Sequence, residues 1–386
     1  MKQNWTYKKL TDVCDIQYGY PFNSAHFSDL PFDGMPLIRI RDVKDGQTST
    51  YYKGDYPQEY IIHKGDYLVG MDGEFNIAPW KSDDALLNQR VCKISSKNKE
   101  VYVGYLYRFL SKELKKIEDE TPFVTVKHLS AKRLNQVSIP VPPLPTQSRI
   151  VSELDLLQSL IDKQKAQLKE LDNLAQAIFY DMFGDPTVND KGWEKQKLGD
   201  CFSYIKNGAN IKQDKSQIGF PITRIETLSN GVFNRDRMGY AGITDKTKYE
   251  QYILQDKDLL MSHINSKAYI GRTVLYRKKE GEVFIHGMNL LRLVPLPLLD
   301  SEFFCYLAKT DYVKEKIASI RKDAVNQSSF AISDLKKIDI PIPPLPLQQS
   351  FAQKVESIER QKELINQSIR EAQTLFDSRM EYYFGE

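Results

Sequence analysis

Histidine and cysteine side chains build many catalytic and metal centres, but in this sequence they are widely scattered. The four cysteines form no Cys-x-x-Cys pair, and no histidine lies beside any of them at metal-ligand spacing. This spacing favours reduced structural thiols. His63, His263 and His286 have no serine, cysteine or carboxylate at a spacing that indicates a catalytic triad, although the members of a triad meet in space and need not be close in sequence.

The sequence also lacks the short motifs that bind nucleotides or methyl donors. It contains no Gly-x4-Gly-Lys-Ser/Thr phosphate loop, no glycine-rich cradle for a nucleotide or S-adenosylmethionine, and no Asn-Pro-Pro-aromatic motif. Glu113 and Lys115 fit the end of a nuclease motif, but they lie in an amphipathic stretch without the Pro-Asp partner. We therefore expect no catalytic residue, no metal site and no cofactor in this chain.

The composition is that of an ordinary soluble protein. A chain of 386 residues, 41% of them hydrophobic, is long enough for two or three domains. No stretch approaches the roughly 18 apolar residues of a membrane span. Residues 1–10 lack the apolar core of a signal peptide, so we expect a cytoplasmic protein.

The net charge of +3 is small, but the charge is unevenly distributed. Lys and Arg outnumber Asp and Glu in residues 1–145 and 186–346, and the reverse holds in residues 146–185 and 347–386. A polyanion would therefore prefer the first and third segments.

The sequence is an internal duplication. Residues 5–12 (WTYKKLTD) resemble residues 193–200 (WEKQKLGD) at an offset of 188, and residues 64–68 resemble residues 256–260 at an offset of 192. The strongest match joins IPVPPLPTQ at 139–147 to IPIPPLPLQ at 340–348, where seven of nine positions are identical at an offset of 201. From there the offset stays constant to the end of each copy. The segments before the Pro-rich match therefore tolerated insertions, and the segments after it did not.

The two segments of constant offset are predicted to be long helices. Residues 146–183 contain no Gly or Pro and place apolar side chains every three or four positions, and residues 347–386 show a similar seam. Gln164 interrupts the first seam, and Lys362 and Arg379 interrupt the second. At 1.5 Å per residue the first helix is about 57 Å long. Equal lengths and narrow stripes favour an antiparallel coiled coil, with two helices docked separately on their own domains as the alternative.

The segments of drifting offset are predicted to be mixed α/β domains. They combine short alternating stretches typical of strands with short amphipathic helices, and between the shared anchors the two copies differ almost completely. The predicted organisation is a first domain at 1–145, a long helix at 146–185, a second domain at 186–346 and a long helix at 347–386. Antiparallel helices would relate the two domains by a pseudo-twofold axis.

This organisation resembles the specificity subunits of type I restriction-modification systems. In that family two target-recognition domains alternate with two long helical spacers, and each helix follows an IPxPPLPxQ-like segment, found here at 139–147 and 340–348. The resemblance covers essentially the whole chain. It implies a non-catalytic, sequence-specific DNA-binding subunit in which each domain reads one part of a split target and the helices fix the gap. Because the two domains differ in sequence, we expect that target to be asymmetric.

The resemblance also implies partners. The ligand would be double-stranded DNA, and the helices would hold methyltransferase (modification) subunits, two of them, which bring S-adenosylmethionine and methylate adenine. Restriction and translocase subunits would add ATP, Mg and DNA cleavage. No membrane is implied.

Candidate DNA contacts are side chains in predicted turns that can donate hydrogen bonds or stack. Arg can read guanine and Asn or Gln can read adenine, whereas Lys and Ser usually hold phosphates. In the first domain the candidates are Arg39, Arg41, Tyr51, Tyr52, Lys53, Gln89, Arg90, Lys127 and His128. In the second domain they are Arg224, Arg235, Arg237, Asn265, Ser266, Lys267, Asn289, Asn326, Gln327 and Ser328. Arg39 and Arg224 occupy equivalent positions, which also fits a shared phosphate or structural contact.

Two other functions remain open on the sequence alone. One is a standalone DNA methyltransferase or nuclease with an unrecognised site, which the missing cofactor motifs disfavour. The other is a coiled-coil scaffold that binds only proteins. Salt-dependent binding to duplex DNA separates the scaffold from a DNA reader.

Overall fold

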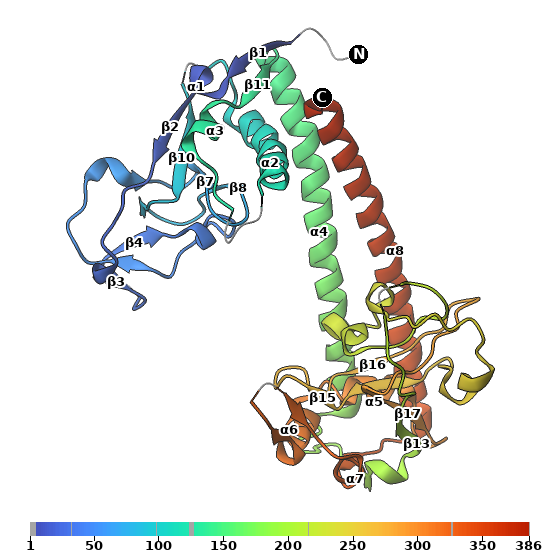
Figure 1. Ribbon diagram of the computed structural model, residues 1–386. Coiled ribbons are helices and arrows are strands. Elements are labelled where there is room, and N and C mark those ends of the chain that lie inside the picture. The colour runs from blue at the N-terminus through green and yellow to red at the C-terminus, as the bar shows by residue number, and fades with distance from the viewer. Residues whose placement is uncertain are drawn as a thin grey trace. The chain divides into compact units, whose positions relative to one another are not determined.

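The computed structural model describes residues 5–31, 33–97, 99–122, 127–214, 216–325 and 327–385 (Figure 1). It contains two compact units. Unit 1 consists of Met1–Lys165 and Gln367–Glu386, and unit 2 of Ala166–Asn366. Over the described residues, no helix is both long enough and apolar enough to cross a membrane.

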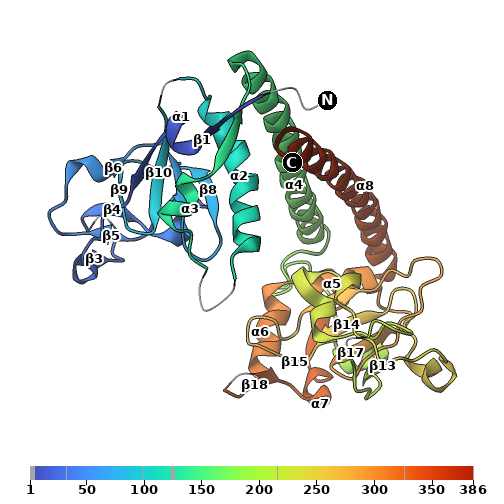
Figure 2. The same cartoon turned by 45° about the horizontal axis from the view of Figure 1, so that its top comes forward.

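Unit 1 is built on a four-stranded antiparallel sheet with the strand order β2-β10-β7-β8. A second sheet has the order β3-β5-β4-β9-β6, and β1 pairs with β11. The strands are β1 (Thr6–Lys9), β2 (Cys14–Tyr18), β3 (Phe27–Ser28), β4 (Met35–Ile38), β5 (Tyr51–Tyr52), β6 (Ile61–Ile62), β7 (Tyr67–Gly70), β8 (Asn76–Pro79), β9 (Ala85–Leu87), β10 (Val91–Ser96) and β11 (Ser138–Val141). The short helices are α1 (Leu10–Val13), α2 (Val103–Glu120) and α3 (Ala131–Asn135), and α2 packs against β8 (Figure 2).

Unit 2 repeats the four-stranded sheet and the two-stranded pairing of unit 1 but differs in its other sheet. Its four-stranded sheet has the order β13-β17-β14-β16, β12 pairs with β20, and a small sheet has the order β15-β19-β18. The strands are β12 (Lys195–Lys197), β13 (Phe202–Asn207), β14 (Leu259–Ser262), β15 (Ile264–Asn265), β16 (Thr273–Leu275), β17 (Leu290–Pro295), β18 (Lys322–Asp323), β19 (Ser328–Ser329) and β20 (Asp339–Pro341). The short helices are α5 (Ser301–Leu307), α6 (Asp311–Ile320) and α7 (Ile332–Leu335).

The two four-stranded sheets correspond strand by strand, and a shared turn shows why the sequence match at 64–68 and 256–260 exists. Asp66 accepts a hydrogen bond from the backbone N–H of His63 at 2.9 Å, and Asp258 accepts one from the N–H of Gln255 at 2.6 Å. Each aspartate thereby closes the turn before the strand that follows it, β7 or β14. The turn chemistry explains why an aspartate occupies this position in both copies.

The strongest repeated segment ends in a glutamine that fastens the start of each long helix. Gln147 is fully buried; its amide nitrogen donates to the carbonyls of Glu100 and Pro142, both at 2.8 Å, and its oxygen accepts from the N–H of Tyr102 at 2.7 Å. Gln348 makes the same three kinds of bond to unit 2. A buried amide with all these partners holds the long helix to its recognition domain.

The long helices are α4 (Leu144–Phe183) and α8 (Leu345–Phe384). Each begins two residues earlier than the sequence suggested, since Pro145 and Pro346 fit the first turn of a helix, where no N–H bond is needed. As expected, α4 ends before Gly184, which adopts a left-handed φ of 72° and donates its N–H to the carbonyl of Tyr180 at 2.8 Å.

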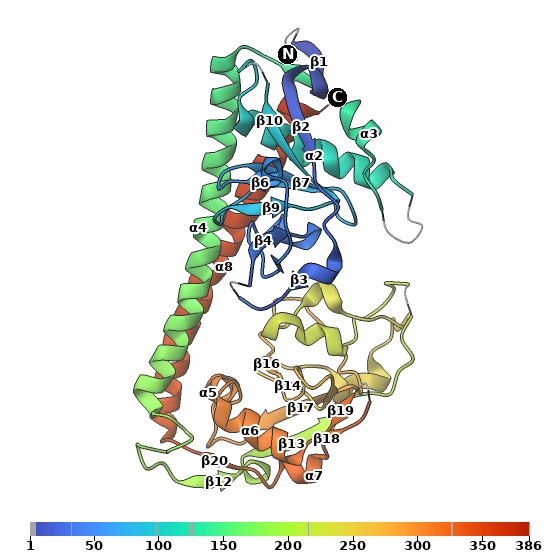
Figure 3. The same cartoon turned by 90° about the vertical axis from the view of Figure 1, so that its left-hand side faces the viewer.

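Within each unit the α4 and α8 segments lie side by side and run antiparallel (Figure 3). In unit 1, Glu153 contacts Arg379 at 2.8 Å, and Gln164 donates to Ser368 Oγ at 2.6 Å. Residues further along α4 therefore contact residues nearer the start of α8, as expected for antiparallel helices. All these residues lie in unit 1.

In unit 2, Asp172 contacts Lys362 at 2.7 Å, and the rings of Phe179 and Phe351 are 5.7 Å apart. The three polar interruptions of the predicted seams, at Gln164, Lys362 and Arg379, are thus all contacts between the two helices. The helix segments also pack into the core of each unit, so each unit shows contacts between the helices together with docking on the domain.

Candidate nucleic-acid interface

Three loops of unit 1 meet at one end of its four-stranded sheet. The N–H of Met71, after β7, bonds the carbonyl of Arg90 at 2.9 Å, the N–H of Gly73 bonds the carbonyl of Lys127 at 2.9 Å, and the N–H of Leu129 bonds the carbonyl of Met71 at 2.7 Å. The backbone thus ties together residues 71–73, 88–90 and 127–129, which we name loop cluster 1. This cluster contains four of the sequence candidates: Gln89, Arg90, Lys127 and His128.

Arg90 and His128 are held by a carboxylate that the sequence analysis did not select. His128 Nδ1 and Asp72 Oδ1 form a very short contact at 2.5 Å, and Asp72 Oδ2 lies 3.5 Å from Arg90 Nε. The Arg90 guanidinium also lies 3.3 Å from both ring nitrogens of His128. Arg90 has a φ of 73°, a conformation that costs a non-glycine residue about 1 kcal/mol or more. The ion pair and the backbone bonds hold it there.

Unit 2 has the equivalent arrangement, loop cluster 2, formed by residues 263–267, 287–289, 321–325 and 327–329. Strand β19 pairs with β15 through Asn265 and Ser328, and the side chain of Asn207 donates to the carbonyl of Met288 at 2.8 Å and lies 3.0 Å from His263 Nε2. The cluster brings together the candidates Asn265, Ser266, Lys267, Asn289, Gln327 and Ser328. Asn326 lies outside the described residues.

Close approach of the chain beneath each cluster requires a glycine. A Cβ on Gly19 would lie 2.0 Å from the carbonyl oxygen of Asn88, and one on Gly208 would lie 2.0 Å from that of His286. In both units the next residue forms a parallel bridge to the turn, Tyr20 with Asn88 and Ala209 with Gly287. Sequence reasoning missed these glycines, although their offset of 189 fits the repeat.

Arg39 and Arg224 occupy equivalent local structures, as their alignment predicted. Each is exposed and precedes a 3-10 helix, Ile40–Asp42 or Ile225–Gly231. The N–H of Arg39 bonds a carboxylate oxygen of Asp42, and the N–H of Arg224 bonds Thr227 Oγ1, both at 2.8 Å. Both arginines lie near the clusters, since Ile38 pairs with Leu87 beside the 88–90 turn and Thr223 Oγ1 accepts from the N–H of Gly287 at 2.9 Å.

Several other candidates are occupied by contacts within the protein. Tyr52 is 7% exposed and packs among Phe22 and Phe27, so its ring belongs to a core and is not available to a ligand. Arg235 forms a bidentate pair with Glu282 at 2.5 and 3.0 Å.

Burial and existing pairs also limit a second group of candidates. Ser328 is 3% exposed. Lys127 donates to the carbonyl of Glu118, and Lys53 pairs with Asp33 at 2.5 Å. Arg41 lies 3.6 Å from Asp42.

The remaining candidates are more accessible. Gln89, Arg237, Ser266, Lys267, Asn289 and Gln327 are exposed, and Tyr51 and Asn265 are half-buried. Of these, Arg237 and Tyr51 lie outside the two clusters.

Two histidines are buried at loop cluster 2: His263 belongs to it, and His286 directly precedes its 287–289 turn. Burial lowers the pKa of His263 to about 4 and that of His286 to about 3, so both rings are neutral near pH 7. The Nδ1 atom of each is buried without a hydrogen-bond partner among the described residues. Both histidines are isolated in the sequence, so no local pattern predicted that they would lie this close to the candidate interface.

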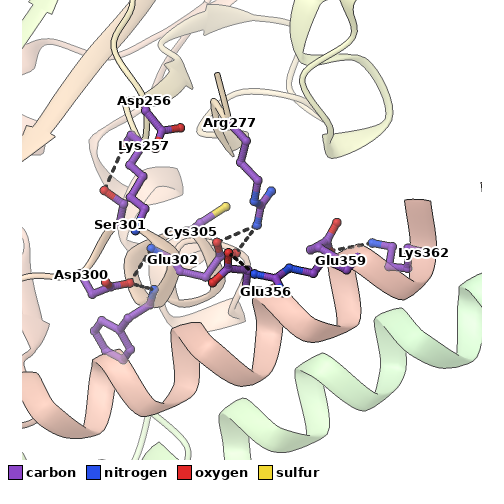
Figure 4. Close-up of polar contacts among 12 residues, drawn as sticks. Asp256, Lys257, Arg277, Asp300, Ser301, Glu302, Cys305, Glu356, Glu359 and Lys362 are labelled. Atoms are coloured by element: carbon purple, nitrogen blue, oxygen red, sulfur yellow. Dashed lines mark hydrogen bonds and ion pairs between the residues drawn. The ribbon is translucent and has the colours of Figure 1, made fainter. Parts of the chain in front are cut away.

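Two groups of polar side chains in unit 2 lie beside each other, one on α5 and the loop after β16 and the other on α8 (Figure 4). Arg277 donates to both carboxylate oxygens of Glu302 on α5, at 2.6 and 2.7 Å. Burial raises the pKa of Glu302, and the nearby Arg277 opposes that rise. On α8, Glu359 binds Lys362 at 2.9 Å, and Lys362 also binds Asp172 of α4. An ion pair between Lys279 and Glu363, at 3.5 Å, joins the loop after β16 to α8.

Comparison with known proteins gives a consistent result. A family model described as the type I restriction modification DNA specificity domain matches residues 2–173 and 190–374. The type I restriction enzyme EcoBI specificity subunit of Escherichia coli is 27% identical over 96% of this chain and 82% of its own length. The putative MjaX specificity subunit of Methanocaldococcus jannaschii is 38% identical over 46% of this chain and 42% of its own length.

A similar fold is found among solved structures. The S subunit of a type I restriction-modification system from M. genitalium covers 99% of this chain and 96% of its own, with a TM-score of 0.59 and 12% sequence identity.

Proposed function

This chain belongs to the family of type I restriction-modification DNA specificity subunits, and from that premise we propose how it selects DNA. It is the non-catalytic subunit that recognises DNA sequence in a type I complex. The single observation behind the detailed proposal is the repeated loop cluster, present once in each unit at the same end of an equivalent sheet.

We propose that each cluster reads one part of a bipartite target. Arg90 and His128 of loop cluster 1 offer donors suited to guanine, and Asn265 and Asn289 of loop cluster 2 offer amides suited to adenine. The different chemistry of the two clusters supports an asymmetric target. The proposed domain limits are 1–145 and 186–346 for the two readers.

The proposed contact set is smaller than the sequence set. It keeps the accessible candidates in or beside the clusters and omits Tyr52, whose ring is buried in a core, and Arg235, whose guanidinium is engaged in a bidentate pair with Glu282. The proposed base-reading or phosphate-holding residues are Arg39, Gln89, Arg90, His128, Arg224, Asn265, Ser266, Lys267, Asn289 and Gln327.

The helix pair is the proposed spacer and docking surface. Antiparallel contacts within each unit and the repeated glutamine clamp support a pseudo-twofold relation between the readers and a coiled coil between α4 and α8. Both helices expose leucines that no contact within a unit covers: Leu156 at 72% and Leu364 at 67% are examples. Such side chains suit a protein partner.

We propose that this partner is the methyltransferase subunit, in two copies, with restriction and translocase subunits completing the complex. The partners would supply S-adenosylmethionine, ATP and Mg, and the complex would work in the cytoplasm.

Copurification and salt-dependent binding test this function. The chain expressed with the type I methyltransferase subunit of its own host should copurify as a stable complex, and that complex should bind duplex DNA with an affinity that falls steeply as salt rises. Failure to copurify, or binding that is insensitive to salt, would contradict the proposal.

A further inference from the structure

We infer that two carboxylates, Asp72 and Asp323, determine the sequence specificity of the two loop clusters. Each holds cationic or polar side chains of its cluster in place and repels DNA phosphates, so that the exposed donors, Arg90 and His128 in one cluster and Lys267 in the other, meet base edges. The inference rests on the proposed DNA-reading function and adds to it two positioning residues that have no local sequence signature.

In loop cluster 1 the carboxylate is central. Asp72 contacts His128 through one oxygen and Arg90 through the other, and its backbone bridges to His128. Its side chain is 26% exposed, whereas those of Arg90 and His128 are 54% and 45% exposed. The carboxylate therefore lies at the base of the cluster, and the two donors project further into solvent.

In loop cluster 2 the carboxylate comes from a different element. Asp323 lies on β18, directly opposite Ser328, and the three-stranded sheet that contains both is seen in Figure 3. It accepts from Arg321 Nε at 2.6 Å and from Ser328 Oγ at 2.7 Å, and Lys267 Nζ lies 3.3 Å away. These partners, Arg321 first, lower the pKa of Asp323, which stays ionised at any ordinary pH. Each unit has thus placed one carboxylate among its donors, from a non-equivalent position in the chain.

Such a pairing is unsuited to phosphate binding. A cation that holds a phosphate gains most when no anion competes for it, and an aspartate about 3 Å from the cation repels the approaching phosphate. A base edge has no net charge, so the repulsion is absent there. An arginine already oriented by a carboxylate also keeps its planar fork in one direction, which favours bidentate contact with guanine. The carboxylate itself can accept from the amino group of cytosine.

The alternative is that Asp72 only stabilises the fold. A purely structural residue would, when replaced, lower stability and reduce binding to all DNA together. A specificity residue would change the ratio of specific to non-specific binding. The two roles therefore differ in a measurable ratio.

The experiment uses the complex of this chain with its methyltransferase. Binding is measured at two salt concentrations to a duplex that carries the methylated sequence found in host DNA, and to a scrambled duplex of the same composition. Asp72→Asn should weaken specific binding about tenfold and strengthen scrambled binding about threefold, because the chain loses one negative charge beside the DNA. Base substitutions in the half of the target read by unit 1 should then be tolerated, and those in the other half should not.

Two further variants complete the test. Asp323→Asn should relax the opposite half of the target. Asp15→Asn changes the charge equally, but at the far end of β2 from the cluster, and should leave the ratio unchanged. If Asp72→Asn keeps the ratio, or lowers both affinities and the melting temperature together, the inference is wrong. A wild-type complex with no sequence preference would instead refute the proposed function itself.

Discussion

An ion pair is buried in unit 2, and its counterpart in unit 1 is partly exposed, so the unit 1 pair serves as a control for a prediction about the unit 2 pair. Asp258 lies 2.8 Å from Arg292, with side-chain exposures of 4% and 11%. The equivalent pair in unit 1, Asp66 with Lys93, is 3.5 Å apart, with exposures of 27% and 22%. The same turn therefore carries a buried ion pair in unit 2 and a partly exposed ion pair in unit 1.

The magnitudes follow from burial. Asp258→Ala leaves the buried guanidinium of Arg292 without a carboxylate, with only the carbonyls of Gln251 and Ile253 as acceptors, which costs about 3–5 kcal/mol. It also removes the bond to the N–H of Gln255, worth about 1 kcal/mol. Asp66→Ala loses a comparable turn bond and an accessible pair worth at most about 1 kcal/mol, for a total of about 1–2 kcal/mol.

Burial raises the pKa of Asp258 even beside Arg292, so desolvation outweighs the attraction. We therefore expect the double variant Asp258→Ala, Arg292→Leu to recover about 3 kcal/mol relative to the single variant.

The measurement is urea unfolding followed by hydrogen exchange and mass spectrometry, which reports each unit through its own peptides. Asp66→Ala serves as the matched control. Equal losses for Asp66→Ala and Asp258→Ala, or a double variant no more stable than Asp258→Ala, would refute the argument that burial decides the cost.

Three further outcomes are expected. Gln348→Leu should destabilise unit 2 by about 2–4 kcal/mol in urea unfolding, because three bonds are lost and buried backbone groups are left unpaired; a loss below about 1 kcal/mol contradicts the clamp. Burial lowers the pKa of His263 to about 4 and that of His286 to about 3, so the unfolded chain binds both protons at a higher pH than the folded chain does. These two groups leave stability constant above about pH 6.5, and below it each lowers stability by about 3 kcal/mol by pH 4, about 6 kcal/mol together. His263→Gln should roughly halve that fall in unfolding measured across this pH range, and an unchanged slope argues against the assignment. Replacing both Gln164 and Ser368 by Leu and Ala should raise the melting temperature, since the amide oxygen of Gln164 is buried without a partner; a lower melting temperature would show that the pair stabilises the helices.

The long helices could be predicted from the sequence because their signals are local and repeated. Apolar spacing, the preceding proline-rich segment and the glycine after Phe183 all indicate the same element, and the structure places α4 and α8 within two residues of the predicted ranges. The role of Gln147 and Gln348 was not foreseen, since their partners are backbone groups from distant loops.

The recognition loops could be predicted only in part. Arg90 and His128 were selected as donors, but the Asp72 that joins them lies 56 positions before His128 and has no local signature. Tyr52 was selected as an aromatic in a turn, and only the packing of Phe22 and Phe27 around it shows that it belongs to a core. Long-range packing decides which turn residues stay accessible, and a single sequence does not contain that information.

Two unlike readers on one helical spacer should select a split target. Sequencing the methylated bases in the genome of a host that carries this chain and its methyltransferase shows whether they do. We expect one modified sequence made of two different short parts separated by a gap of fixed length and free sequence, with adenine methylated in both parts. A single continuous site, or a palindromic one, would contradict it.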